Sequence, residues 1–120
     1  MSAGHTEEAV AVLQETERVN PAHCNAAYNL GTTLIRLFRY QDALAPLSRA
    51  LACYEREGRV GVYLADTYFN LGVAFSRLGR SSEAEAHFRA LLRIAPSYPG
   101  GRIALGEVLA RQRNGSPGRP

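Results

Sequence analysis

Hydrophobic residues between Ala65 and Pro96 recur at the three- and four-residue steps of an α-helix, in two runs separated by a polar turn. The two runs are formed by Tyr68, Leu71, Phe75 and Leu78, and by Ala84, Phe88, Leu91 and Leu92. Gly72 lies inside the first apolar face, where a missing side chain lets another helix approach closely. The stretch predicts a helical hairpin that ends at Pro96.

Polar residues mark where two of the helices are expected to begin. Ser82 precedes Glu85 by three residues, which predicts a capping box at the start of the second helix of this hairpin. Thr6, followed by two glutamates, is expected to cap a helix near the start of the chain.

The hairpin pattern occurs more than once along the chain. Tyr28-Asn29-Leu30-Gly31 matches Phe69-Asn70-Leu71-Gly72, and Ala104-Leu105-Gly106 matches the last three of these residues. The three glycines are 41 and 34 residues apart, and a small residue recurs twelve positions after the first two of them, as Ala43 and Ala84. Ala9 lies 34 residues before Ala43. Such periods indicate a stack of similar helical units.

These residues resemble the tetratricopeptide repeat, whose period is about 34 residues. One copy carries the family pattern as Tyr68, Leu71-Gly72, Phe75, Ala84, Phe88 and Pro96, and the other as Ala27, Leu30-Gly31, Leu34, Ala43, Leu47 and Ala50. The resemblance covers roughly residues 4–113. It implies an all-α fold, a right-handed α-α superhelix (solenoid) of about three helical hairpins with roughly six helices. The first helix of each pair then lines a concave surface.

The resemblance assigns residues 1–113 to one repeat domain. The tail, residues 114–120, is expected to be disordered because its composition does not supply enough apolar burial to order it. The domain is expected to contain a half repeat (4–21), a repeat (22–57) with a linker (58–61), a repeat (62–96) and a terminal half repeat (97–113). The repeat with the longer period is expected to use its extra residues to lengthen the helices on both sides of the linker.

Composition narrows the function classes. The chain has 120 residues, a formal net charge of +3 and no run of apolar residues near the length of a membrane span. The N-terminus lacks the basic and apolar segments of a signal peptide. We therefore expect a cytoplasmic protein with no membrane or nucleic-acid partner. Cys24 and Cys53 form no CxxC motif and are expected to be free packing thiols in a reducing compartment.

Register relative to the glycines predicts the residues of the concave groove. They are Asn25, Tyr28, Asn29, Thr32, Arg36, Asp66, Phe69, Asn70, Val73, Arg77 and Arg111. Asparagine amides suit the N–H and C=O groups of an extended peptide, arginines suit carboxylates, and the aromatic residues supply apolar contact. The alternative is that these asparagines and arginines only form a solvated face. For Tyr28 and Phe69, the alternative to contacting a peptide is packing in the wall of the groove.

The resemblance narrows the class of partner that is expected. In relatives such as O-linked N-acetylglucosamine transferase, asparagines at this place form a ladder that binds a peptide. Co-chaperone relatives instead hold chaperone tails with a carboxylate clamp, and that clamp needs basic residues where this chain has Tyr28, Gly100 and Ala104. A clamp of that type is therefore rejected. The identity of the protein or peptide partner stays open.

Catalysis finds little support in the sequence. There is no nucleophile or phosphate-loop motif, and His5, His23 and His87 are far apart with no metal-ligand spacing. We therefore expect a protein-interaction scaffold that is not an enzyme and has no cofactor and no metal.

Two alternatives to peptide binding stay open. The last helix carries Ile103, Leu105, Val108 and Leu109 on more than one side, which favours self-association into a homo-oligomer. The chain would also suit a segment of a longer repeat array.

Overall fold

The computed structural model describes residues 3–19, 24–58 and 61–115. These residues form six α-helices: α1 (Ala3–Val19), α2 (Cys24–Arg36), α3 (Tyr40–Arg56), α4 (Val62–Arg77), α5 (Ser81–Ile94) and α6 (Gly101–Gly115). No strand occurs among the described residues. The predicted all-α architecture is confirmed.

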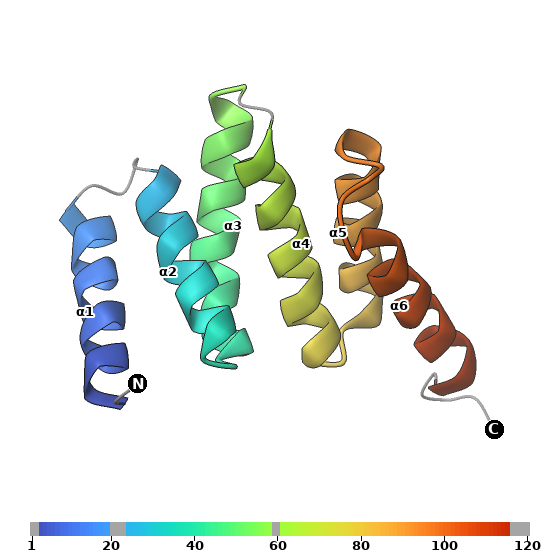
Figure 1. The fold of residues 1–120 in the computed structure, drawn as a ribbon, viewed down its shortest axis with the longest axis horizontal. Coiled ribbons are helices and arrows are strands. Elements are labelled where there is room, and N and C mark those ends of the chain that lie inside the picture. Colours follow the sequence, from blue (N-terminus) through green and yellow to red (C-terminus); the bar gives the residue numbers. More distant parts are fainter. Residues whose placement is uncertain (1–2, 20–23, 59–60, 116–120) are drawn as a thin grey trace.

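The helices follow one another across the molecule in chain order, and each runs antiparallel to the next (Figure 1). The pairs α2/α3 and α4/α5 make the most extensive helix contacts and correspond to the two predicted hairpins. α2 also contacts α4, and α4 contacts α6, so these three helices share one layer, while α3 and α5 lie behind it (Figure 1). α3 and α4 have 17 and 16 residues, against 14 and 13 in α5 and α2, so the longer repeat lengthens both helices beside the linker, as predicted.

Two glycines set the spacing within the hairpins. A Cβ atom added to Gly72 would lie 2.5 Å from the ring of Phe88, and one added to Gly31 would overlap the side chain of Leu47. Neither position has room for a larger residue, because the bulky side chain of the facing helix already fills the space. The close approach that the sequence predicts at Gly72 is confirmed.

One hydrophobic core runs through the whole row of helices. Leu47, Leu71 and Phe88 are at most 1% exposed, and the core extends from Val10 of α1 to Val108 of α6. A second, smaller cluster surrounds Tyr54, where α2, α3 and α4 meet. Its buried members are Cys24, Ala27, Ala50, Cys53, Tyr54 and Leu64.

The predicted helix starts at Ser82 and Thr6 are wrong. α5 begins one residue earlier, at Ser81, and α1 begins at Ala3, so both residues lie inside their helices. The N-cap of α5 is Arg80, and it makes no side-chain capping hydrogen bond. A capping box needs its serine at the non-helical position that precedes the helix, and Ser82 does not occupy it.

Arginine–carboxylate pairs occur at two helix starts instead. The Nε of Arg80 donates to Glu83 at 2.6 Å, and the Nε of Arg39, at the start of α3, donates to Asp42 at 3.0 Å. The two arginines have nearly the same backbone angles and lie at equivalent positions in their hairpins. Exposed pairs of this kind contribute about 0.5 kcal/mol, so they help to define the helix start without dominating stability.

The end of the chain differs from the prediction. α6 begins at Gly101 rather than near residue 97, and it continues to Gly115, so Asn114 and Gly115 belong to the helix and not to the tail. The remaining tail residues, 116–120, lie outside the described residues. Residues 20–23 at the predicted first repeat boundary and residues 59–60 of the linker also lie outside them.

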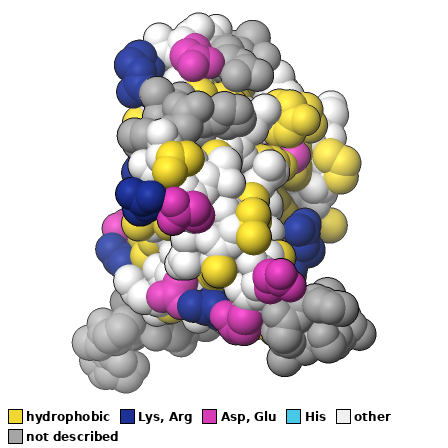
Figure 2. All heavy atoms as spheres, turned by 90° about the vertical axis from the view of Figure 1, so that its left-hand side faces the viewer, with side chains coloured by type: hydrophobic (Ala, Val, Ile, Leu, Met, Phe, Trp, Pro, Cys, Tyr) yellow, Lys and Arg dark blue, Asp and Glu magenta, His cyan; other side chains and the backbone are white. Residues whose placement is uncertain are grey.

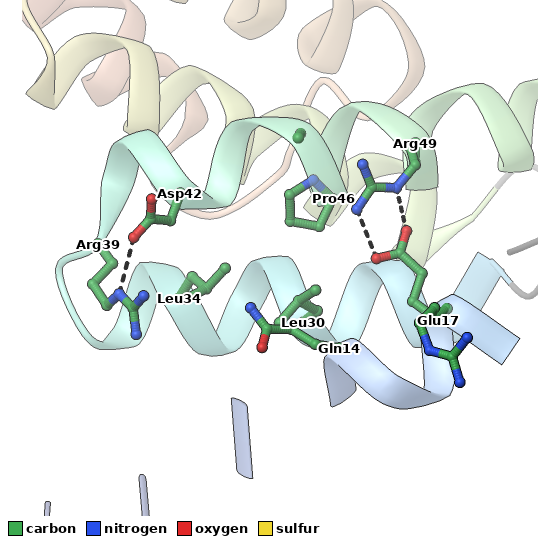
Figure 3. A pocket seen from close by; sticks show the side chains of 10 residues that line it. Gln14, Glu17, Leu30, Leu34, Arg39, Asp42, Pro46 and Arg49 are labelled. Atoms are coloured by element: carbon green, nitrogen blue, oxygen red, sulfur yellow. Dashed lines mark hydrogen bonds and ion pairs between the residues drawn. The ribbon is translucent and has the colours of Figure 1, made fainter. Parts of the chain in front are cut away.

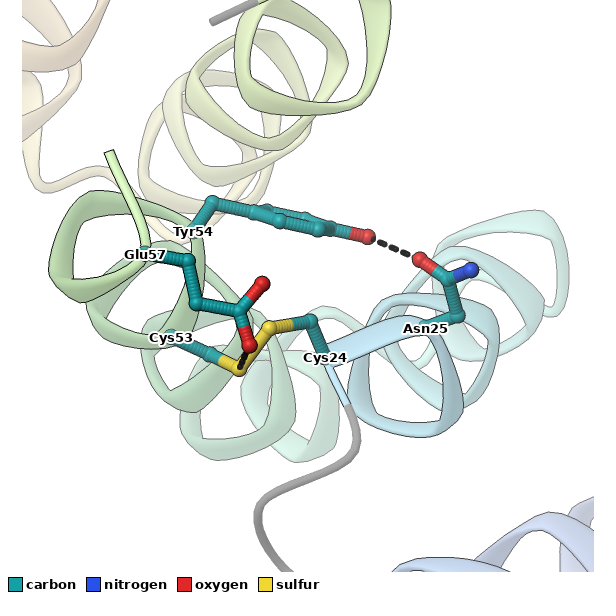
Figure 4. The surroundings of a disulfide bond; sticks show 5 residues. All are labelled: Cys24, Asn25, Cys53, Tyr54 and Glu57. Atoms are coloured by element: carbon teal, nitrogen blue, oxygen red, sulfur yellow. Dashed lines mark hydrogen bonds between the residues drawn. A yellow bond between two sulfur atoms is a disulfide. The ribbon is translucent and has the colours of Figure 1, made fainter. Parts of the chain in front are cut away.

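The two cysteines form a disulfide, so the prediction of free thiols is wrong (Figure 4). Cys24 is the first residue of α2 and Cys53 lies in the last turns of α3, with their Cα atoms 5.4 Å apart. Antiparallel packing of the two helices brings these positions together although they are 29 residues apart in sequence. The inference of a reducing compartment rested on free thiols and loses that support.

Candidate functional site

The layer of α2, α4 and α6 carries the predicted binding surface. A hollow of about 560 Å³ opens over α2 and α4, and Leu13 of α1 and Tyr98, from the loop before α6, also line it. Seven of the eleven predicted binding residues line this hollow: Tyr28, Asn29, Thr32, Arg36, Asp66, Phe69 and Asn70. α2 and α4 run in the same direction one repeat apart, so equivalent positions on the two helices meet here.

Asp66 links two tyrosines in the wall of the hollow. The hydroxyl of Tyr28 donates to Oδ2 of Asp66 at 3.0 Å, and the hydroxyl of Tyr98 donates to Oδ1. The ring of Phe69 packs against Tyr98, with the ring centroids 5.1 Å apart. Burial raises the pKa of both tyrosines well above the ordinary value, and the Asp66 carboxylate raises it further. Both oxygens of Asp66 are therefore engaged, and these residues form the wall of the hollow.

These hydrogen bonds predict a loss of stability at alkaline pH. The raised pKa values mean that the neutral hydroxyls of Tyr28 and Tyr98 stabilise the fold below about pH 10, the ordinary tyrosine pKa, and that this stabilisation is lost as pH rises towards the raised values. Burial and a hydrogen bond to Glu55 raise the pKa of Tyr68 to about 12, so this residue acts in the same direction. We expect the free energy of unfolding, measured in urea titrations, to fall steadily above about pH 10.

The absorbance of the tyrosine phenolates tests the same assignment. It should appear at higher pH in the folded chain than in the urea-unfolded chain. In Asp66→Asn it should appear at lower pH than in the native fold, because the negative charge beside Tyr28 and Tyr98 is gone. If the phenolate absorbance of Asp66→Asn rises at the same pH as that of the native fold, the hydrogen bonds of Tyr28 and Tyr98 to Asp66 are contradicted.

Two asparagine side chains line the hollow at equivalent positions. Asn29 on α2 is exposed and Asn70 on α4 is half-buried. Within the described part of the chain, neither amide side chain is engaged in a hydrogen bond. An amide both donates and accepts, so the pair can bond the C=O and N–H groups of an extended backbone. Arg36, exposed in the same hollow, adds a forked donor suited to a carboxylate.

The other four predicted binding residues do not line the hollow; they are Asn25, Val73, Arg77 and Arg111. The Oδ1 of Asn25 accepts a hydrogen bond of 2.7 Å from the Tyr54 hydroxyl (Figure 4). Arg111 donates to the carbonyl oxygen of Ser76 at 3.0 Å and to its Oγ at 2.8 Å. Val73 packs partly against the core, and Arg77 is exposed at the end of α4. Asn25 and Arg111 are therefore used within the fold.

The predicted self-association residues of α6 differ in exposure. Ile103 is 69% exposed and Leu109 is 37% exposed, whereas Leu105 is half-buried. Val108 is only 1% exposed, because it points into the core. Its inclusion in a self-association surface is therefore corrected, since no partner can reach its side chain.

A larger hollow, which the sequence does not reveal, lies between α1 and α3 over a floor that includes Leu30 and Leu34 (Figure 3). Its volume is about 620 Å³. The carboxylate of Glu17, which is 8% exposed, accepts two hydrogen bonds from Arg49 at this hollow. This pairing raises the pKa of Arg49. The other charged lining residues are also paired, Arg18 with Glu15 and Arg39 with Asp42. This hollow therefore offers a ligand fewer unpaired polar side chains than the hollow over α2 and α4.

Three side chains near the disulfide have the composition of a metal site. The sulfur atoms of Cys24 and Cys53 and a carboxylate oxygen of Glu57 lie within 4.8 Å of one another (Figure 4). The two sulfurs are bonded to each other, and a metal-binding cysteine must be a free thiolate. This group therefore does not suit a metal in its disulfide form.

Comparison with known families explains the repeated glycines and the hairpins. A sequence model of the tetratricopeptide repeat matches residues 22–97, which include both complete hairpins and lie between α1 and α6. The chain belongs to the tetratricopeptide repeat family. In this repeat protein, Gly31 and Gly72 are the glycines at which the paired helices approach each other. Membership of the family indicates a protein–protein interaction module.

Solved structures of other tetratricopeptide repeat proteins share this arrangement of helices. The MamA RS-1 ArsTM double mutant has a TM-score of 0.80 at 22% identity over 92% of this chain and 58% of its own. TTC0263, a thermophilic repeat protein of Thermus thermophilus, has a TM-score of 0.69 at 27% identity, over 89% of this chain and 51% of its own. The Arabidopsis OM64 tetratricopeptide repeat domain has a TM-score of 0.75 at 21% identity, over 90% of this chain and 84% of that domain.

These likenesses establish the fold of the repeat protein. The chain spans a little over half the length of the MamA and TTC0263 chains. A comparison with curated proteins finds no match. Among the described residues, no helix combines the length and the apolar character needed to cross a membrane.

Proposed function

We propose that this tetratricopeptide repeat protein binds an extended segment of a partner protein in the hollow over α2 and α4. The observation that carries the proposal is the pair of asparagines, Asn29 and Asn70, whose amide side chains lack hydrogen-bond partners within the described residues and line one hollow. The proposed role is recognition and scaffolding rather than catalysis.

The chemistry of the lining favours an extended segment. Two amides on parallel helices, one repeat apart, can each pair with main-chain groups of a peptide that crosses both helices. Phe69, half-buried beside Tyr98, supplies apolar area for a side chain of the peptide. Arg36 favours a segment with an acidic residue near its α2 end, because the guanidinium is exposed and available for a forked pair with a carboxylate.

Substituting Asn70 by alanine tests the proposal. Linear peptides selected from a displayed random library on the native chain are the probes, and isothermal titration measures their affinity. Asn70→Ala is expected to weaken binding about tenfold, the loss of roughly one to two hydrogen bonds, without changing the far-ultraviolet circular dichroism spectrum. Arg36→Glu is expected to abolish the preference for acidic peptides.

A matched control separates this site from a general surface effect. Asn114→Ala makes the same change on α6, where Asn114 is exposed and does not line the hollow. This variant should bind the selected peptides as tightly as the native chain does. Selection of no peptide, or equal affinity of the Asn70→Ala and native chains, would overturn the proposal.

A further inference from the structure

α6 exposes the helix face that α2 and α4 bury. Gly106 occupies the same repeat position as Gly31 and Gly72, yet a Cβ atom added to Gly106 would meet nothing within 4 Å among the described residues. Leu109, at the position of Phe75, is 37% exposed against 8% for Phe75. The space beside the repeat glycine that accepts a side chain of the second helix, here called the slot, is therefore open on α6 as far as the described residues are concerned.

α1 exposes the complementary face. Ala9, Leu13 and Thr16 lie 34 residues before Ala43, Leu47 and Ala50, all three of which are 0% exposed in α3. In α1 the first and third of these positions are exposed and Leu13 is half-buried. Val12 and Val19 continue the same face at 58% and 64% exposure. Figure 2 looks onto this end of the molecule, where hydrophobic side chains lie open between acidic and basic residues.

The two faces match in register, and the two helices carry opposite net charges. Within the chain, Gly31 receives Leu47 and Gly72 receives Phe88, and the same register brings Leu13 opposite Gly106. α1 carries four glutamates and one arginine, whereas α6 carries three arginines and one glutamate. Glu7, Glu15 and Glu17 already pair with arginines of their own chain, so the opposite net charges of the two helices favour the pairing as a long-range attraction.

We propose that α1 of a second copy of this chain docks against α6 and completes a hairpin between the two molecules. Leu13 of one copy then fills the slot at Gly106 of the other, as Leu47 fills the slot at Gly31 within the chain. The contact joins two different surfaces, so each copy keeps one free face after a single docking event. Such a head-to-tail contact builds an open chain of copies or a closed ring, not a simple symmetric dimer.

Docking would also extend the binding surface. α4 contacts α6 and α2 contacts α4 within one chain, so a docked α6 would continue the same layer beside α2 of the next copy. Leu13, which docking buries, lines the hollow over α2 and α4. The proposed peptide groove and the proposed assembly are therefore neighbours, but neither requires the other.

Light scattering behind size exclusion, over a concentration series, tests the assembly. The native chain is expected to show a mass that rises above the 13.1 kDa of one chain as concentration increases, and less so at high salt. Gly106→Leu fills the slot and Ala9→Arg puts a charge in the α1 face, and each is expected to weaken association at least ~10-fold. No described residue of the same chain fills the space beside Gly106, and Ala9 is exposed, so neither variant should unfold the chain.

Two control variants make the same changes elsewhere on the same helices. Glu107→Leu lies one residue from Gly106, turned by about 100° around α6, and Ala11→Arg lies two residues from Ala9 on an exposed side of α1. Both controls should associate like the native chain. A native mass of 13.1 kDa at every concentration, or native-like association of Gly106→Leu, would overturn the proposal.

Mixing the two blocked variants distinguishes a head-to-tail contact from a symmetric one. Gly106→Leu keeps an intact α1 face and Ala9→Arg keeps an intact α6 face. At a concentration where the native chain associates and each variant alone is a single chain, an equimolar mixture should form a one-to-one complex that grows no further. If the mixture stays at one chain mass while the native chain associates, the contact is not the proposed pairing of α1 with α6.

Discussion

Replacing Phe88 by alanine is expected to lower the free energy of unfolding by about 4 kcal/mol. Phe88 is 1% exposed, and its ring fills the space between α5 and the backbone of α4 at Gly72. It also packs against Phe69, with the ring centroids 5.8 Å apart. The neighbouring helices are held by the rest of the core, so they can close only part of the cavity that alanine would leave. Urea titration followed by circular dichroism measures the loss.

A double-mutant cycle with Gly72 tests why the glycine is needed. In the native chain, Gly72→Ala is expected to cost about 1–3 kcal/mol, because the added Cβ atom would lie 2.5 Å from the Phe88 ring. In the Phe88→Ala background the new methyl group enters emptied space. Alanine also favours a helix over glycine by about 1 kcal/mol, so the same substitution should be neutral or stabilising there.

Gly106→Ala is the matched control for this cycle. It makes the same change at the same repeat position of α6, where a Cβ atom would meet nothing within 4 Å among the described residues. At concentrations where the chain is a single molecule, it should stabilise the fold by up to about 1 kcal/mol in both backgrounds. If Gly72→Ala costs the same with and without Phe88, close helix approach is not the reason for the glycine.

The hairpins could be predicted because their determinants are periodic and local. Apolar residues at helical spacing mark the buried face, and Gly31 and Gly72 mark where a facing side chain must fit. The 34-residue spacing of Ala9 and Ala43 places α1 in register even though it lies outside the matched span of the family. These signals depend on spacing alone, and spacing is fully present in the sequence.

The details of the candidate site depend on contacts between distant residues, and spacing alone does not give those. Register identifies the side of the helix on which Asn25 lies, but not that the hydroxyl of Tyr54 reaches it. Tyr98 lies in a loop that the sequence assigns to the start of the last helix, and it bonds Asp66, 32 residues away. Such contacts depend on loop geometry and on the reach of side chains.

The disulfide lies between these two cases, because the sequence contains a signal for it that depends on spacing. If Gly31 faces Leu47 in an antiparallel hairpin, then the residue seven before Gly31 lies opposite a residue about seven after Leu47. Cys24 and Cys53 occupy nearly these positions. The search for a CxxC motif misses this pairing, whereas the register of the hairpin contains it.

Removing the Cys24–Cys53 disulfide is expected to lower the free energy of unfolding by about 3.5 kcal/mol, the chain-entropy value for a loop of this length. This is a large share of the roughly 5–15 kcal/mol typical of a whole domain. Urea titrations with and without dithiothreitol measure the effect. The Cys24→Ala/Cys53→Ala double variant should show no response to the reductant. If Cys24 and Cys53 can both be alkylated after the chain has been purified and unfolded without reductant, the disulfide is contradicted.

The loss of stability should be local before it is global. The disulfide anchors the small cluster around Tyr54, which joins the main core through the half-buried Leu51 and Tyr68. Each repeat in a solenoid depends mainly on its neighbours. Reduction is therefore expected to speed amide hydrogen exchange in α2 and α3 more than in α5, which takes no part in that cluster. Because α2 carries Asn29 and Arg36, the same loosening should weaken peptide binding in the hollow while α5 stays protected. Equal acceleration of exchange in α3 and α5 would instead mean that the disulfide stabilises the domain only as one cooperative unit.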